Sequence, residues 1–130
     1  MFVEYLENPQ AINSMYDDLD LDGVILKDLK LSREGPEVYF TIKLSKFPDR
    51  PPKKWDKEFN SANIEFKFVE LENIKLLRWG RYNFCNGLIR KNQDGAITLE
   101  FKGLDVDLSV RGKFLTFVKI SGYCNGRTET

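Results

Sequence analysis

The sequence predicts a mainly β domain (α+β by strict count): an antiparallel β-sandwich or partly open barrel of about eight or nine short strands with one short N-terminal helix. Three observations support this prediction. Between about residues 24 and 123, apolar and polar residues alternate with the period of two that is typical of half-buried strands. Turn-favouring residues separate the alternating runs. The length of 130 residues fits a single domain, 1–130, with one core, and the abundant phenylalanine predicts a phenylalanine-rich core.

The predicted helix spans about residues 9–18. Asn8 can accept hydrogen bonds from the free N–H groups of a first helical turn, and Pro9 at the first helical position sacrifices no hydrogen bond. Apolar side chains then recur at helical spacing, at Ile12, Met15, Tyr16 and Leu19. We expect this apolar face to pack on the sheet.

The β-domain is predicted over about residues 24–123. Its first strand runs from Val24 to Leu31, with a bulge near Lys27 or Asp28 because the apolar phase changes there. Further alternating runs predict strands at 38–44, 64–68, 74–79, 97–101, 106–110 and 114–121. Residues 82–88 are less regular. Strands with one apolar face need two packed layers or a closed barrel to bury those faces.

Turn chemistry supports the later strand boundaries. The residues Asn92-Gln-Asp-Gly95 predict a hairpin, since glycine accepts a positive φ and aspartate favours the start of a turn. A second turn is predicted at Lys102-Gly103. The polar tail, residues 124–130, is expected to fray.

The segment from Lys46 to Trp55, here called the proline loop, is stiff. Prolines at positions 48, 51 and 52 fix φ and remove backbone donors, so the segment cannot join a central strand. Two roles are open. The loop closes one end of the β-domain with Trp55 packed inside, or it docks an acidic partner through Arg50, Lys53, Lys54 and Trp55.

Composition argues against several functions. The 20 basic residues balance 20 acidic ones, which argues against nucleic-acid and membrane partners. The absence of histidine excludes histidine-based catalysis and most transition-metal sites. Cys85 and Cys124 lack a metal-binding spacing, so we expect buried free thiols. We predict no cofactor and no metal. The start of the sequence does not resemble an export signal and no apolar run is long enough to span a membrane, so we expect a cytoplasmic protein.

The first 22 residues carry six acidic and no basic residues, whereas lysine and arginine are concentrated between 43 and 57. These two poles can neutralise each other in the fold, or one can face a charged partner. Residues 18–23 match the first half of a calcium loop, but Leu29 occupies the position of the required bidentate glutamate. We interpret the segment as a solvated acidic connection between helix and sheet. The alternative is an acidic patch that faces a partner, with Asp17, Asp18, Asp20 and Asp22 as the candidate partner-binding residues.

Aromatic side chains raise another possibility, a platform for a carbohydrate or a single-stranded nucleic acid. Phe66 and Phe68 argue against it, because their spacing puts both rings on one face of a strand, where a core is the ordinary explanation. The run from Trp79 to Tyr82 has enough aromatic surface for a ligand but equally suits a strand end. No serine, cysteine or lysine has the context of a nucleophile, a Schiff base or a phosphate loop, so no catalytic residue and no enzymatic activity is predicted.

Several features in a fixed order resemble a known family. They are Asn8-Pro9, Met15-Tyr16, Phe47-Pro48, Pro51-Pro52 with Lys54-Trp55, Asn60 before Ile64-Glu-Phe66, Trp79-Gly80, and Ile120-Ser-Gly-Tyr123. The pattern resembles the immunity protein 50 family of bacterial polymorphic-toxin systems and extends from about residue 8 to residue 123.

This resemblance implies a cytoplasmic antidote that binds a cognate toxin domain and blocks it, with no activity of its own. It supplies no ligand or catalytic residue. If the toxin carries a basic surface, the four aspartates would suit it; if the toxin surface is acidic, the proline loop would. The alternative function, from another class, is a small β-sandwich module that binds a carbohydrate or a similar ligand.

Overall fold

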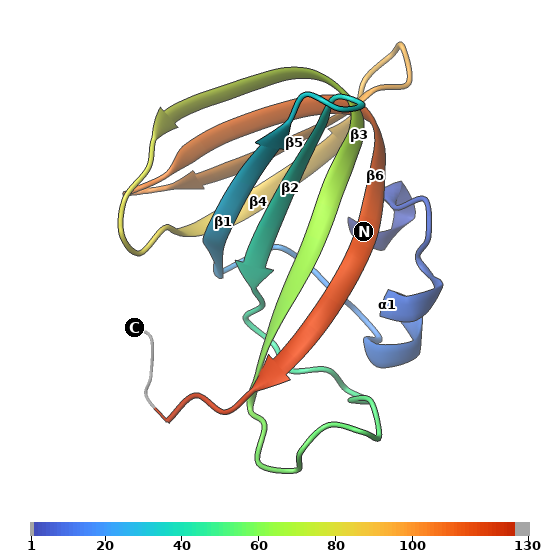
Figure 1. Ribbon diagram of the computed structural model, residues 1–130, viewed down its shortest axis with the longest axis vertical. Coiled ribbons are helices and arrows are strands. Elements are labelled where there is room, and N and C mark those ends of the chain that lie inside the picture. Colours follow the sequence, from blue (N-terminus) through green and yellow to red (C-terminus); the bar gives the residue numbers. More distant parts are fainter. Residues whose placement is uncertain (1, 127–130) are drawn as a thin grey trace.

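The computed structural model describes residues 2–126. Six strands form one antiparallel sheet that closes on itself in the order β1-β2-β3-β6-β5-β4 (Figure 1). The prediction of a mainly β fold with one short helix is confirmed, but the predicted strand number is wrong. The strands are β1 (Val24–Ser32), β2 (Glu37–Lys43), β3 (Ser61–Arg78), β4 (Phe84–Lys91), β5 (Ile97–Gly103) and β6 (Asp107–Tyr123).

The error in strand number arises from β3 and β6, each of which the alternation predicts as two strands. In the structure these two long strands stay paired through several register shifts, one of them between Leu71 and Asn73. Glu70, with a φ of 55°, precedes this shift. A bulge moves the apolar residues to the other phase of the alternation without ending the strand. In the sequence, the same change of phase is indistinguishable from a strand end.

Two local predictions are confirmed. The register of β1 against β2 shifts between Leu26 and Asp28, where the bulge was predicted. The hairpin between β4 and β5 forms at the predicted turn, where the Gly95 N–H donates to the Asn92 carbonyl oxygen at 3.0 Å. Gly95 has a φ of 91°, which glycine adopts without the cost that a side chain would bring.

The chain around β4 differs from the prediction. Residues 82–88 look irregular in the sequence, yet β4 pairs with β5 from Cys85 to Lys91. Its alternation is obscured because Phe84 and Leu88 are half or more exposed. The next turn also lies later than predicted, at residues 104–105, because Lys102 still pairs with Asp107 in the ladder.

The N-terminal segment lies beside β6 and contains a 3-10 helix, η1 (Phe2–Tyr5), and the helix α1 (Gln10–Met15) (Figure 1). The helix is shorter than the predicted 9–18 because the backbone of Tyr16 is already extended, with φ −125° and ψ 135°. The apolar residues predicted for its buried face are nevertheless all buried, including Tyr16 and Leu19 beyond the helix.

Asn8 does not cap the helix as predicted, since α1 has no side-chain cap at its N-terminus. Its side chain instead bonds the backbone of β6: Nδ2 donates to the Phe117 carbonyl oxygen at 2.9 Å, and the Phe117 N–H donates to Oδ1 at 2.8 Å. A parallel bridge joins Leu6 to Leu115 close by. Because β5 pairs with β6 only as far as Gly112, the N-terminal segment takes its place beside the rest of β6.

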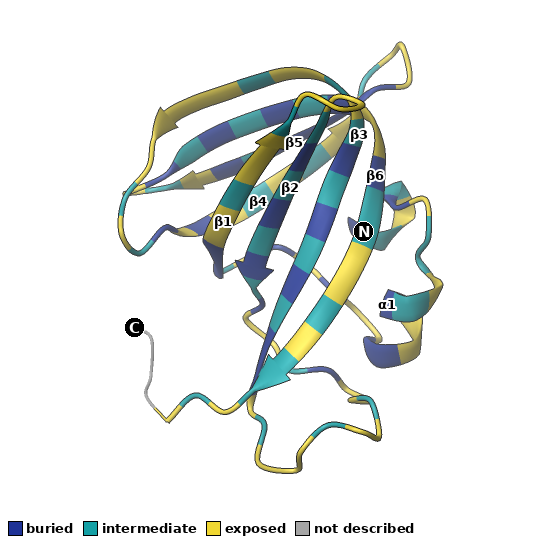
Figure 2. Ribbon diagram, viewed as in Figure 1, coloured by how far each residue is buried: buried dark blue, intermediate teal, exposed yellow. Residues whose placement is uncertain are grey.

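The core is rich in phenylalanine, as predicted. Side chains of β2, β3 and β5 that alternate inward are almost fully buried, and Figure 2 shows the alternation along β2 and β3. The Phe66 ring lies 5.7 Å from that of Phe40 and 4.9 Å from that of Phe2. Phe2 therefore ties the N-terminal segment into the core.

Residues 44–60 form a long connection between β2 and β3, at the opposite end of the molecule from the β1–β2 turn (Figure 1). Its end is bound to the start of the polar tail: Asn60 Nδ2 donates to the Asn125 carbonyl oxygen at 2.8 Å, and the Asn125 N–H donates to Asn60 Oδ1 at 2.8 Å. The last part of the tail that was expected to fray, residues 127–130, lies outside the described residues.

Replacing Asn8 tests its role. Asn8→Ala should lower the free energy of unfolding by about 1–3 kcal/mol, because two backbone groups of Phe117 in a half-buried site lose their partner. Asn8→Ser should be similarly destabilising, since serine can cap a helix but cannot bond both groups. Urea denaturation followed by circular dichroism measures both variants, with Asn13→Ala on the exposed face of α1 as the control. Full recovery of stability in Asn8→Ser would indicate a capping role instead.

Candidate functional site

The acidic segment, residues 17–22, connects α1 to β1 and runs alongside β4. The Leu21 carbonyl oxygen accepts a hydrogen bond from the Gly87 N–H at 2.8 Å, and the Gly23 N–H donates to Asn86 Oδ1 at 2.7 Å. Leu19 and Leu21 are buried, so the aspartates between and beside them face outward. The segment therefore presents its carboxylates on the surface from a backbone that is held in place.

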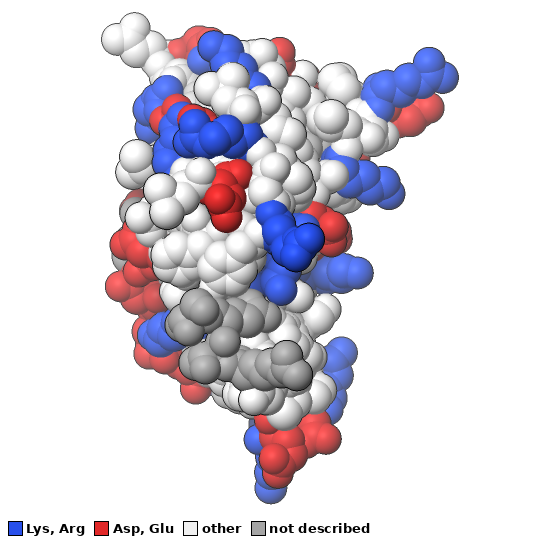
Figure 3. All heavy atoms as spheres, turned by 90° about the vertical axis from the view of Figure 1, so that its left-hand side faces the viewer, with Lys and Arg blue, Asp and Glu red and all other residues white. Residues whose placement is uncertain are grey.

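The four candidate aspartates differ in their partners. Asp17 Oδ1 lies 2.6 Å from Arg50 Nη1, so this carboxylate is neutralised by the proline loop. In residues 2–126, no ion pair is found for Asp18, Asp20 or Asp22. Figure 3 shows acidic side chains gathered along one side of the face it displays. All four carboxylates are exposed, and three of them have no ion pair among residues 2–126.

A hollow of about 210 Å³ lies between the acidic segment and β4. Asp20 and Asp22 line one side of it, and Leu88, which is 66% exposed, lines the other. Tyr5 of η1 also lines it. The hollow combines apolar surface with carboxylates whose charge is uncompensated. Sequence reasoning did not single out Leu88, because the stretch around it looked irregular.

The proline loop is anchored to the N-terminal segment through Arg50. Its Nε donates to the Ser14 carbonyl oxygen at 2.9 Å and its Nη2 to the Asn13 carbonyl oxygen at 3.2 Å, at the end of α1. A cation at a helix C-terminus satisfies free carbonyl groups and favours the helix dipole. Its third partner is Asp17, so the guanidinium group of Arg50 is used for contacts within the fold.

Asp49 adds to this anchor. Its Oδ2 accepts a hydrogen bond from the Asp17 N–H at 2.8 Å, and its Oδ1 lies 3.1 Å from Lys46 Nζ. The backbone hydrogen bond from Asp17, with Lys46 beside it, lowers the pKa of the Asp49 carboxyl below its ordinary value. Tyr16 OH donates to the Lys46 carbonyl oxygen at 2.7 Å, and burial, together with the charge of Asp49, raises the pKa of Tyr16 well above its ordinary value.

The other end of the proline loop packs on the barrel. Trp55 is half-buried between Phe47 and Phe59, with ring centroids 5.8 Å and 6.0 Å away. A side chain at Gly122 of β6 would come within 2.6 Å of the Trp55 ring, so the ring needs a glycine there. Lys53 and Lys54 are exposed, and the described residues provide no ion pair for either.

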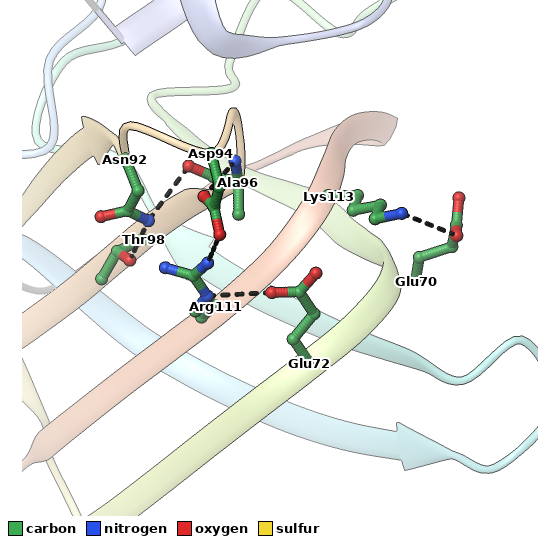
Figure 4. Close-up of polar contacts among 8 residues, drawn as sticks. All are labelled: Glu70, Glu72, Asn92, Asp94, Ala96, Thr98, Arg111 and Lys113. Atoms are coloured by element: carbon green, nitrogen blue, oxygen red, sulfur yellow. Dashed lines mark hydrogen bonds and ion pairs between the residues drawn. The ribbon is translucent and has the colours of Figure 1, made fainter.

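The charged side chains of a polar cluster near the β4–β5 hairpin are all paired within the cluster (Figure 4). Arg111 of β6 lies between two carboxylates: its Nε is 2.9 Å from Glu72 Oε1, and its other side contacts Asp94. Lys113 Nζ lies 3.9 Å from Glu70 Oε1. The cluster thus joins β3, β6 and the hairpin, and its paired charges offer little to a ligand.

Two findings concern metal binding and the reactivity of the thiols. In the part of the chain that the structure covers, no group of three His, Cys, Asp or Glu side chains could hold a metal ion. Burial raises the pKa of the Cys85 thiol to about 11, so it is a poor nucleophile. Cys124 is free but exposed, which corrects the expectation that both thiols are buried. Among residues 2–126, no helix has the length and apolar character needed to cross a membrane.

The variant Asp49→Asn tests whether the Asp49 carboxylate stabilises the fold in a pH-dependent way. Because the folded pKa of Asp49 is lower than the unfolded one, its contribution to stability is complete at neutral pH and is lost as the pH falls below about 4. The variant should be less stable than wild type at neutral pH, and the difference should shrink below about pH 4. Thermal unfolding between neutral and acidic pH measures it. Asp18→Asn, which removes an exposed carboxylate without an ion pair in the described chain, should leave stability at neutral pH unchanged.

Comparison with known proteins identifies the family to which this chain belongs. The model of the immunity protein 50 family matches residues 8–123, nearly the whole chain. No curated protein and no solved structure matches the chain. The matched range includes the acidic segment, the proline loop and all six strands. The chain therefore belongs to the immunity protein 50 family.

Proposed function

We propose that this protein is a bacterial immunity protein that binds one cognate toxin of a polymorphic-toxin system. It blocks the toxin by direct contact, in the cytoplasm and without an enzymatic step. The family match over residues 8–123 carries this proposal. The scaffold supports it, because a closed sheet with an anchored N-terminal segment presents surface groups with little rearrangement on binding.

The acidic segment is the proposed site of contact with the toxin. Asp18, Asp20 and Asp22 are exposed without an ion pair in residues 2–126, so their field is available to steer a basic protein surface. Asp17 contributes through its position beside them, although Arg50 neutralises it.

The proline loop is the weaker candidate for this role. Arg50 donates its hydrogen bonds to the N-terminal segment, and Trp55 is half-buried against Gly122, which leaves Lys53 and Lys54 as its accessible groups. These two lysines would suit an acidic toxin surface. They serve best as a matched control for the acidic segment.

Co-expression tests the function directly. The wild-type protein should restore growth of cells that produce the toxin domain encoded beside its gene, and the two proteins should co-purify as a complex. Toxicity that persists without any complex would reject the proposal for that pair. Binding to a glycan array without protection from the toxin would favour the carbohydrate-binding alternative.

Neutralising the acidic segment should weaken the complex. In the triple variant Asp18→Asn, Asp20→Asn, Asp22→Asn, association should slow by roughly tenfold or more at low salt, and its dependence on salt should become shallower. Asp17 is kept because its pair with Arg50 belongs to the fold. Surface plasmon resonance at several salt concentrations measures the rates. The control Lys53→Gln, Lys54→Gln should bind like wild type; unchanged affinity and salt dependence in the triple variant would contradict the acidic site.

A further inference from the structure

A second exposed surface lies next to the acidic segment, at the place where β1 meets β4. It consists of Tyr82, Phe84 and Leu104, here called the seam surface, which line one hollow. Phe84 is 50% exposed and Leu104 94%. The rings of Tyr82 and Phe84 stack, with centroids 6.1 Å apart and planes 9° from parallel. Figure 3 shows uncharged side chains, with charged ones among them, on this side of the molecule.

The loop that carries the aromatic residues is rigid because of Asn83. This side chain is 2% exposed, and its Oδ1 accepts a hydrogen bond from the Gly80 N–H at 2.8 Å. The Asn83 carbonyl oxygen accepts a further bond from the Leu26 N–H at 3.1 Å, which attaches the loop to β1. Asn83 has a φ of 56°, a conformation that asparagine tolerates better than most residues.

The β5–β6 turn packs tightly against this loop. A side chain at Gly103 would come within 2.1 Å of the Phe84 carbonyl oxygen, and one at Gly80 within 2.7 Å of the Asp105 side chain. These close approaches place Leu104 beside Phe84, and both line a hollow of about 410 Å³. Exposed aromatic and leucine side chains that are held in place lose little entropy when a partner covers them.

The seam surface and the acidic segment are continuous. A Cβ atom at Gly23 would lie 3.6 Å from the tip of the Phe84 ring. The Gly23 N–H also donates to Oδ1 of Asn86, which lines the hollow of about 410 Å³. Asp22 immediately precedes that glycine. The acidic segment therefore adjoins Phe84 through Asp22 and Gly23.

Some of the charged side chains around the hollow of about 410 Å³ are paired and others are not. Asp107 lies 2.6 Å from Lys102 Nζ and 3.8 Å from Arg78 Nη2, so both cations share one carboxylate. Arg81 and Asp105 are exposed and have no ion pair within residues 2–126. On the side of Phe84 that approaches Gly23, the acidic segment adds Asp22, and Asp20 lies beside Asp22 in the neighbouring hollow. An apolar centre with an acidic flank fits a basic protein surface.

We propose that the seam surface is the centre, and the acidic segment the rim, of one continuous surface that binds a basic region of the toxin. This proposal rests on the proposed function and adds to it the residues that supply most of the affinity. Buried aromatic and aliphatic anchors dominate interface energetics, whereas rim charges act on association and selectivity. Phe84 and Leu104 are these anchors.

Leu104 is the residue at which to test the proposal, because a side chain that is 94% exposed can be changed without cost to the fold. Three variants, Leu104→Ser, Leu104→Asp and Leu104→Arg, remove the same apolar group and differ in charge. The matched control is Val118→Ser, on the part of β6 that lies beside Asn8. Affinity for the toxin domain encoded beside the gene is measured by isothermal titration calorimetry, and protection by growth of the toxin-producing cells.

We expect Leu104→Ser to raise the dissociation constant roughly tenfold or more. Leu104→Arg should weaken binding further than Leu104→Asp, because arginine repels a basic surface and aspartate attracts it. This difference should shrink as salt is raised, since salt screens exposed charges. Val118→Ser should bind and protect like wild type.

Four results would overturn the proposal. If the wild-type complex forms and every Leu104 variant binds like Val118→Ser, the seam surface is not the interface and the proposed function stands. If no wild-type complex forms, both proposals fail. Binding of Leu104→Arg at least as tight as that of Leu104→Asp would exclude a basic partner. Dimerisation of the free protein that Leu104→Arg abolishes would assign the surface to a second copy of this chain instead.

Discussion

The pairing of β3 with β6 is the interaction on which the rest of the structure depends. The ladder runs from Ser61 beside Tyr123 to Arg78 beside Asp107, and its register shifts allow it to bend. β2 adds to one half of this ladder through β3, and β5 adds to the other half through β6. The bend therefore brings the two halves of the sheet face to face around the phenylalanine core. Without the bulges, two long straight strands would give a flat sheet with one bare apolar face.

The same geometry gives a short junction where the sheet closes between β1 and β4. β1 and β4 meet over only two residue pairs, Val24 with Cys85 and Ile25 with Phe84. Irregular segments supply the remaining contacts there: Asn83 bonds β1 on one side of the junction, and the acidic segment bonds β4 on the other. Irregular segments on a rigid sheet can vary in sequence without loss of the fold, which is why binding surfaces gather on them. Both the acidic segment and the seam surface lie at this junction, and both are held by hydrogen bonds from buried or strand residues.

Sequence reasoning succeeded where the signal is local. The bulge in β1, the hairpin at Gly95 and the buried face of the N-terminal segment follow from spacing over a few residues. It failed where partners are far apart in the chain. Asn8 bonds Phe117 from 109 positions away, so its cap-like context near Pro9 was misleading. The predicted poles of opposite charge do meet through Asp17 and Arg50, and no pattern near either residue identifies that pair.

The sequence by itself determined that this protein is a mainly β domain with a phenylalanine core, an acidic N-terminal connection and a proline loop, and it carries the order of residues that marks its family. Alternation, turn residues and family motifs are written along the chain and need no partner to be recognised. Only the tertiary structure decided which charges stay uncompensated and which apolar side chains gather outside the core. Tyr82 with Phe84, and Leu104, come from two separate stretches, and each alone looks like a strand end or a turn. They become one surface because the register of the sheet and its closure at β1 and β4 bring them together, and those are properties of non-local pairing.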